Sequence, residues 1–254
     1  MTFNMQVMRP TFYLEDYFML VLYQFKRTWG IPNLSHFCCK LETYLRMAGI
    51  KYEIEPTLPM SGPKRKLPYI KDGDTILGDS GFIVLYLKKK YHDLDKGLSE
   101  AELALSLAMQ RLLEEHLFWA TMYSRWQYTD ENWHANKQAI FGVLPPVIRD
   151  IAAMYYRPKI QQQIYGHGIG RHTAEEIFAL GNQDIDALSA CLGDKKYFLG
   201  DRPTTLDASA FGILINTFGC PIESPVKEHG LSKRNLVSFV NRIKTDYYQD
   251  LQVA

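Results

Sequence analysis

Residues 66–80 read KLPYIKDGDTILGDS, a stretch that places a proline inside a short apolar run and then turns twice. Proline lacks the main-chain N–H that a central strand donates to its neighbour, so Pro68 predicts a special conformation at the entry to a strand. The sequence DGD at 72–74 is a turn signal, and with the short apolar run at 75–77 it predicts a β-hairpin. The pair Asp-Ser at 79–80 is typical of a helix N-cap, so a helix is expected after the hairpin.

The residues before this stretch predict a β-α-β unit. Residues 18–25 form an apolar run of strand length, as expected of a buried central strand. From Ser35 the apolar residues recur with the period of one helix face, and residues 50–55 then alternate between apolar and polar, which is typical of a half-buried strand. A crossover of this length makes the two strands parallel. Residues 18–92 are therefore expected to fold as β-α-β-β-α, preceded by an N-terminal extension at 1–17.

Residues 98–254 contain only helical patterns and predict a second, all-α domain. A capping box of Ser99 and Glu102 precedes a long periodic stretch, which indicates a long first helix. The change in pattern near residues 91–98 marks the boundary between the two domains. Further helix starts are indicated by capping boxes at 173–176 and 204–207.

Composition excludes several classes of protein. The chain has 254 residues and a formal net charge of +1, so no general electrostatic attraction to nucleic acid is expected. The apolar run that begins at Tyr17 follows an acidic pair and is too short to span a bilayer, so no transmembrane segment is expected. No CxxC or Cys/His ligand pair appears, which argues against a metal site and indicates reduced, intracellular cysteines: Cys38, Cys39, Cys191 and Cys220.

Four motifs together resemble the glutathione S-transferase superfamily: SHFC at 35–38, KLPYI at 66–70, GDS at 78–80 and PTTLDA at 203–208. Longer runs resemble its failed-axon-connections and metaxin-like branch, among them EEHLFWATMYSRW at 114–126 and YGHGIGRHTAEEI at 165–177. The resemblance covers about the whole chain from residue 18. It implies a thioredoxin-like N-terminal domain with a cis-proline, followed by an all-α C-terminal domain.

The resemblance also implies a glutathione site in the N-terminal domain. Pro68 would be the cis-proline, and the residue before it, Leu67, would exchange main-chain hydrogen bonds with the cysteinyl part of glutathione. An acidic residue followed by serine at a helix start, here Asp79 and Ser80, would hold the γ-glutamyl group. Lys66 in the basic loop would meet the glycyl carboxylate. From the residues alone, Asp79 and Ser80 are equally explained as helix caps, and Lys66 as a solvated side chain.

Ser35 stands at the helix start where redox members of the fold carry a cysteine. Its hydroxyl can donate a hydrogen bond to the thiolate of bound glutathione, which makes Ser35 the predicted catalytic residue. A hydrogen bond to a charged group is worth about 1.5–3 kcal/mol, enough to lower a thiol pKa by about one to two units. Three alternatives stay open. Ser35 is a helix cap alone, or Cys38 is a redox thiol that forms a mixed disulfide with glutathione. The third is Tyr23 as the catalytic tyrosine of other transferase branches, although its position in an apolar strand favours the core.

The long helix of the second domain is expected to bind the acceptor, a small hydrophobic electrophile. Trp119, Tyr123 and Trp126 recur at helical spacing and are predicted to share a face, which either lines a pocket or packs in the core. Arg125 is the candidate for binding an anionic ligand, because its guanidinium is a planar cation beside aromatic residues in the sequence. The loop 26–34 is longer than in better-studied transferases and is expected to cover or reshape the glutathione site.

These features predict a cytoplasmic glutathione S-transferase-like enzyme that binds glutathione, stabilises its thiolate and transfers it to an apolar electrophile. Two alternatives remain. Metaxin-like relatives act in protein import and membrane-associated assemblies, which would make the fold a non-catalytic interaction module. A glutathione-dependent thiol reductase would use Cys38 instead. A homodimer is expected from the family's habit.

Overall fold

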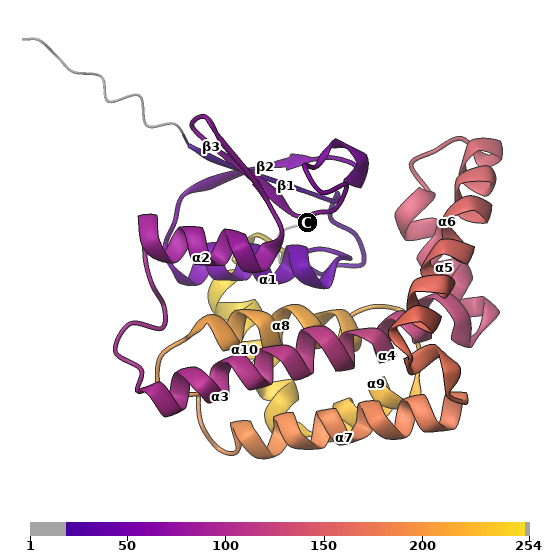
Figure 1. The fold of residues 1–254 in the computed structure, drawn as a ribbon. Helices are drawn as coiled ribbons and strands as arrows, with labels where there is room; N and C mark the ends of the chain where they lie inside the picture. Colours follow the sequence, from indigo (N-terminus) through magenta and orange to yellow (C-terminus); the bar gives the residue numbers. More distant parts are fainter. Residues whose placement is uncertain (1–18, 252–254) are drawn as a thin grey trace, which may run out of the picture.

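A four-stranded mixed sheet with two helices forms the N-terminal part of the computed structural model, which describes residues 19–251 (Figure 1). This confirms the predicted β-α-β-β-α order, whereas the predicted extension at 1–17 lies outside the described residues. The elements are β1 (Leu20–Gln24), α1 (His36–Met47), β2 (Tyr52–Pro56), β3 (Tyr69–Asp72), β4 (Thr75–Gly78) and α2 (Ser80–Lys90).

The strand order β2-β1-β3-β4 brings three chain segments to the same end of the sheet. β1 is parallel to β2 and antiparallel to β3, which in turn pairs antiparallel with β4. Tyr69 at the start of β3 lies opposite Tyr23 in β1 and opposite Gly78 in β4. The end of β1, the start of β3 and the end of β4 therefore meet. At this end the Leu67–Pro68 peptide bond is cis, as predicted.

The rest of the described chain is helical, as predicted. Its first helix is continuous but contains two π-helical segments, Leu112–Leu117 and Ser124–Tyr128. All three predicted capping boxes form, whereas the short helix α9 was not predicted. The helices are α3 (Glu100–Arg111), α4 (Phe118–Tyr123), α5 (Asp130–Phe141), α6 (Pro146–His167), α7 (Ala174–Leu192), α8 (Thr205–Phe218), α9 (Pro225–Ser232) and α10 (Arg234–Tyr247).

Helix α1 of the first domain packs directly on α8 of the second (Figure 1). Gly212 permits this close approach, because a Cβ atom there would lie 2.7 Å from the carbonyl oxygen of His36 and from the nitrogen of Lys40. Beside this contact, Lys40 Nζ lies 2.6 Å from Glu114 Oε1, and both side chains are almost completely buried. The start of α1 is thus held by the helical domain.

No single helix between residues 19 and 251 is long and apolar enough to cross a bilayer. The bent pair α5 and α6 meets that test only when the two helices are taken together.

Candidate functional site

The residues predicted to hold glutathione lie at the one end of the sheet where three strand ends meet. Ser35 follows β1 and its loop, the cis bond at 67–68 precedes β3, and the pair 79–80 follows β4. Because Leu67 lies before the first paired residue of β3, its main-chain N–H and C=O are outside the strand ladder. The fold therefore brings together a hydroxyl, an unpaired stretch of main chain and a helix start.

Ser35 is half-buried and caps helix α1. Its backbone is extended (φ −92°, ψ 122°), and its Oγ accepts a hydrogen bond of 3.3 Å from the main-chain N–H of Cys38. A hydroxyl has one hydrogen to donate besides the lone pairs that accept. Capping uses a lone pair, whereas stabilising a thiolate would use the hydrogen. The two predicted roles of Ser35 are therefore compatible.

Asp79 caps helix α2 from a backbone conformation that few residues adopt. Its φ of 84° is positive, which costs free energy for any residue other than glycine and is concentrated at functional sites. Its Oδ1 accepts hydrogen bonds from the N–H groups of Gly81 (3.0 Å) and Phe82 (3.3 Å), while the side chain stays exposed. Ser80, by contrast, is buried at the first turn. The arrangement leaves Asp79 free to pair with a cation.

The basic loop before Pro68 lies close to the start of α2. The Nζ atom of Lys64 is 4.5 Å from the centre of the Phe82 ring, which places this ammonium beside the first turn of α2. Lys66 is exposed, and its predicted contact with a glycyl carboxylate stays a prediction. Lys64 is therefore a second basic side chain, which lies beside the start of α2.

Cys38 does not have the properties of a redox thiol. Its side chain is completely buried, and burial raises the pKa of its thiol to about 12, although contacts with Ser35 and the carbonyl of Phe25 act in the opposite direction. A thiol needs an accessible, ionised sulfur to attack a disulfide. The structure therefore corrects the thiol-reductase alternative, and Cys38 is part of the packing behind Ser35.

The aromatic residues predicted to share a face of the long helix contact three different helices of the second domain. Trp119 and Tyr123 both lie in the regular helix α4, whereas Trp126 lies in the π-helical segment 124–128, which takes up an extra residue and turns Trp126 away from ideal helical spacing. Tyr123 lies against Phe178 of α7, and Trp126 is buried against Trp133 of α5. Trp126 belongs to the core, and the half-buried Tyr123 packs against it, so of the two predicted alternatives these contacts favour core packing.

Arg125 also has a different role from the predicted one. The side chain is buried, and its guanidinium donates to the carbonyl oxygen of Leu34 and to two oxygens of Asn216. These bonds point into the interface between the domains instead of toward a ligand. The structure therefore replaces the predicted anion clamp with a tie between the domains.

Trp119 remains a candidate for contact with a ligand. It is half-buried and stacks on His167 with ring centres 4.7 Å apart. Its indole N–H has no acceptor in the described part of the chain. This N–H is itself buried, so a bound molecule would contact the exposed part of the ring and not the N–H.

Two asparagines that support Ser35 were not predicted. Asn33 Oδ1 accepts from the N–H of Ser35 at 3.0 Å, and its amide donates to the carbonyl of Phe25. Asn216 in α8 donates to the carbonyl of Asn33 at 3.1 Å. Asn33 could have been found as an asparagine two residues before a helix cap, a typical turn signal. Asn216 could have been found as a polar residue directly after the apolar run 210–215 of helix α8.

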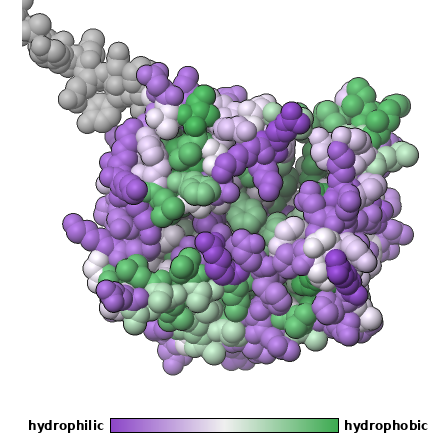
Figure 2. All heavy atoms as spheres, viewed as in Figure 1, coloured by the Kyte–Doolittle hydropathy of each residue, from purple (hydrophilic) through white to green (hydrophobic). Residues whose placement is uncertain are grey.

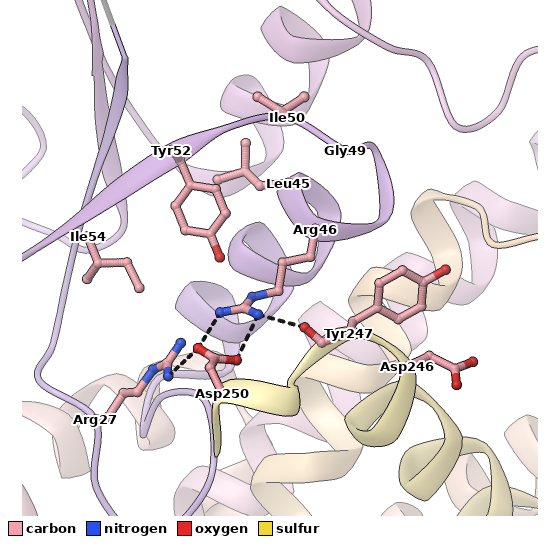
Figure 3. A pocket seen from close by; sticks show the side chains of 10 residues that line it. All are labelled: Arg27, Leu45, Arg46, Gly49, Ile50, Tyr52, Ile54, Asp246, Tyr247 and Asp250. Atoms are coloured by element: carbon pink, nitrogen blue, oxygen red, sulfur yellow. Dashed lines mark hydrogen bonds and ion pairs between the residues drawn. The ribbon is translucent and has the colours of Figure 1, made fainter. Parts of the chain in front are cut away.

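A large open pocket of about 620 Å³ lies at the other end of α1 and is a separate feature (Figure 3). Its wall contains Arg27 and Arg46, which both bond to Asp250 near the chain end and to the buried Glu42. The two cations are thus balanced by two carboxylates. This cluster fastens the C-terminal residues to the first domain.

Comparison with known proteins agrees with this geometry. A family model described as the glutathione S-transferase N-terminal domain matches residues 36–132, and one described as the C-terminal domain matches residues 181–243. The isoprene-epoxide–glutathione S-transferase of Rhodococcus sp. (strain AD45) is 37% identical over 238 residues, which cover 90% of this chain and 99% of that protein. Failed axon connections of Drosophila melanogaster is 35% identical over 91% of this chain, which spans 59% of that longer protein.

A solved structure of glutathione S-transferase III in its apo form has the same fold. The TM-score between the two structures is 0.60 at 18% sequence identity, and the match covers 93% of this chain and 96% of the transferase chain. The thioredoxin-like first domain, the helical second domain and these matches define a two-domain protein of the transferase fold. The chain belongs to the glutathione S-transferase superfamily.

Proposed function

We propose that this protein is a glutathione transferase that binds glutathione at the end of the sheet and transfers its sulfur to a small apolar electrophile. The observation that supports this most strongly is the meeting of Ser35, the main chain at Leu67 and the pair Asp79-Ser80 at one sheet end. Asp79 and Ser80 fit the ammonium and the α-carboxylate of a γ-glutamyl group. Leu67 offers main-chain groups to the cysteinyl unit.

The chemistry needs glutathione as a thiolate. Ser35 donates its hydroxyl hydrogen to the sulfur, which favours the charged form, and the thiol proton leaves to solvent. The sulfur then forms a bond to an electrophilic carbon, and the bond from that carbon to its leaving oxygen or halide breaks with its electron pair. For an epoxide, the resulting alkoxide takes a proton from water. The protein itself forms no covalent intermediate.

The acceptor side is formed by the helical domain. Figure 2 shows the surface hollowed between the N-terminal domain and the hairpin of α5 and α6, with hydrophobic surface inside the hollow. Helix α6 exposes a row of large apolar side chains, and the half-buried Trp119 ring stacks on His167 at the end of this helix. The relative from Rhodococcus is named for an isoprene epoxide, so we propose a small apolar epoxide as the electrophile. The exposed side chains of α6 are Val147, Ile148, Ile151, Met154 and Tyr155.

We expect glutathione to bind the wild-type protein and to bind Asp79→Asn about 10- to 100-fold more weakly. Asparagine keeps the helix cap and tolerates the positive φ, but it loses the charge that pairs with the γ-glutamyl ammonium. Isothermal titration calorimetry with glutathione measures both dissociation constants. Asp74→Asn, in the exposed hairpin turn, is the matched control and should bind as the wild type does. Absence of binding to the wild type would contradict the proposed function.

We also propose that two copies associate through the face formed by α2, β4 and α3. Hydrophobic surface gathers over α2 and α3 in Figure 2, and apolar patches of this kind mark interaction sites. The side chains of this face are each at least 43% exposed: Ile76, Phe82, Leu85, Leu103 and Leu107.

Sedimentation equilibrium should show a dimer for the wild type and a monomer for the double variant Leu85→Glu/Leu107→Glu, because charges cannot be buried in an apolar contact. Met154→Glu introduces the same charge at a residue that is 77% exposed on α6, and it should remain dimeric. A wild type that sediments as a monomer at all concentrations would rule this interface out.

A further inference from the structure

Arg125 is a buried cation that contacts the loop carrying Ser35. Only 3% of its surface is exposed, and its Nη1 donates to the carbonyl oxygen of Leu34 at 2.6 Å. Its Nη2 donates to the carbonyl and to the side-chain oxygen of Asn216 at 3.0 and 2.8 Å. The guanidinium also lies 5.3 Å from the Trp29 ring, within the long loop 26–34. All three oxygen acceptors are neutral, so none of these contacts balances the charge.

The same contacts determine where Ser35 lies. Arg125 holds the carbonyl of the residue immediately before Ser35, and Asn216, held by Arg125, donates to the carbonyl of Asn33. Asn33 in turn accepts from the N–H of Ser35. Each residue from 33 to 35 is therefore fixed by a bond to this network. Since the network is buried, small displacements are resisted by packing on both sides.

Among residues 19–251, no carboxylate is paired with Arg125. On α1, the pKa of His36 lies well below its usual range because of burial and the charge of Arg125, so the imidazole is neutral. Burial raises the pKa of Cys38 and of Cys39, so both thiols are neutral as well. Lys40 is balanced by Glu114 from the π-helical segment 112–117. From α2, Asp79 lies on the surface and is the candidate partner of a ligand cation.

We propose that Arg125 is a positioning residue for Ser35 and that its buried charge stabilises the thiolate of glutathione bound there. The inference rests on the proposed function, since it assigns a second group to the same sulfur. A thiolate next to Ser35 is one residue away from the Leu34 carbonyl to which Arg125 donates. Because Arg125 is buried, the effective dielectric around its charge is low. The charge acts together with the start of α1, where the helix dipole also favours an anion.

The test is an ultraviolet titration of the thiolate of bound glutathione, with binding measured by calorimetry on the same variants. Arg125→Gln should raise the pH at which bound glutathione ionises by about one unit, because one cation is lost from the surroundings of the sulfur. Arg125→Lys keeps a cation and a donor, and it should titrate near the wild-type value. Arg157→Gln is the matched control: Arg157 lies 4.6 Å from the Trp133 ring and donates to a carbonyl, but on α6.

Asn216→Asp is the second variant, should Arg125→Gln not fold. It places a carboxylate oxygen where an amide oxygen now lies 2.8 Å from Arg125 Nη2, so it neutralises the cation without removing it. It should shift the titration in the same direction as Arg125→Gln. An unchanged titration in either folded variant, with glutathione still bound, overturns the role of Arg125 and leaves the proposed function intact. Wild-type protein that binds no glutathione overturns both.

Discussion

Ser35→Ala should lower kcat/KM for glutathione transfer by about 100-fold at pH 7, while the affinity for glutathione changes by less than about twofold. In the proposed mechanism the hydroxyl hydrogen of Ser35 is donated to the ionised sulfur, and a hydrogen bond to a charged group is worth about 1.5–3 kcal/mol. Its loss should raise the thiol pKa of bound glutathione toward the free value, so the thiolate absorbance at pH 7 disappears. Calorimetry and ultraviolet titration measure the two quantities separately.

The loss of a helix cap has to be separated from the loss of a hydrogen-bond donor. Ser35→Asp keeps an oxygen that can accept from the N–H of Cys38, but it has no hydrogen to donate near pH 7. It should therefore fold as stably as the wild type and be as inactive as Ser35→Ala. Ser224→Ala, which removes a similar cap from α9, should cost about 1 kcal/mol of stability and leave activity unchanged. Full activity in Ser35→Asp would reduce Ser35 to a cap.

The order of the first domain could be predicted because its signals are local. Pro68 at the entry to a strand, the DGD turn and the Asp79-Ser80 cap each restrict only a few residues, and their conformations appear in the structure as expected. The parallel pairing of β1 and β2 follows from the length of the crossover. These features bring the site together without any information about the second domain.

The roles of residues in the second domain depend on distant contacts and could not be predicted in the same way. An ideal period of 3.6 placed Trp119, Tyr123 and Trp126 on one face, whereas the π-helical segment 124–128 turns Trp126 away from the other two. Arg125 looked like a ligand clamp because its acceptors, Leu34 and Asn216, are each 91 residues away in the sequence. Helical periodicity cannot show which turn takes up an extra residue or which carbonyl a cation will meet.

The ion pair of Lys40 and Glu114 should be worth far more to stability when broken than when replaced. Glu114→Gln leaves the ammonium of Lys40 buried at the domain interface without a carboxylate, and losing one partner of a buried pair costs about 3–5 kcal/mol. The double variant Lys40→Met/Glu114→Met fills a similar volume with apolar atoms. The double variant should recover most of the lost free energy of unfolding, because no charged group is then buried at the interface.

Urea unfolding monitored by tryptophan fluorescence measures the free energy of unfolding for each variant. Glu223→Gln breaks a pair at the same 2.6 Å distance between Lys227 and a carboxylate whose side chain is 80% exposed, and it should cost about 1 kcal/mol or less. The contrast isolates the burial of the carboxylate, since the two pairs have the same separation and both contain a buried lysine. If Glu114→Gln cost no more than Glu223→Gln, water would have to reach the interface between α1 and the helical domain. The buried charge of Arg125 would then be screened as well, and its effect on a thiolate at Ser35 would shrink with it.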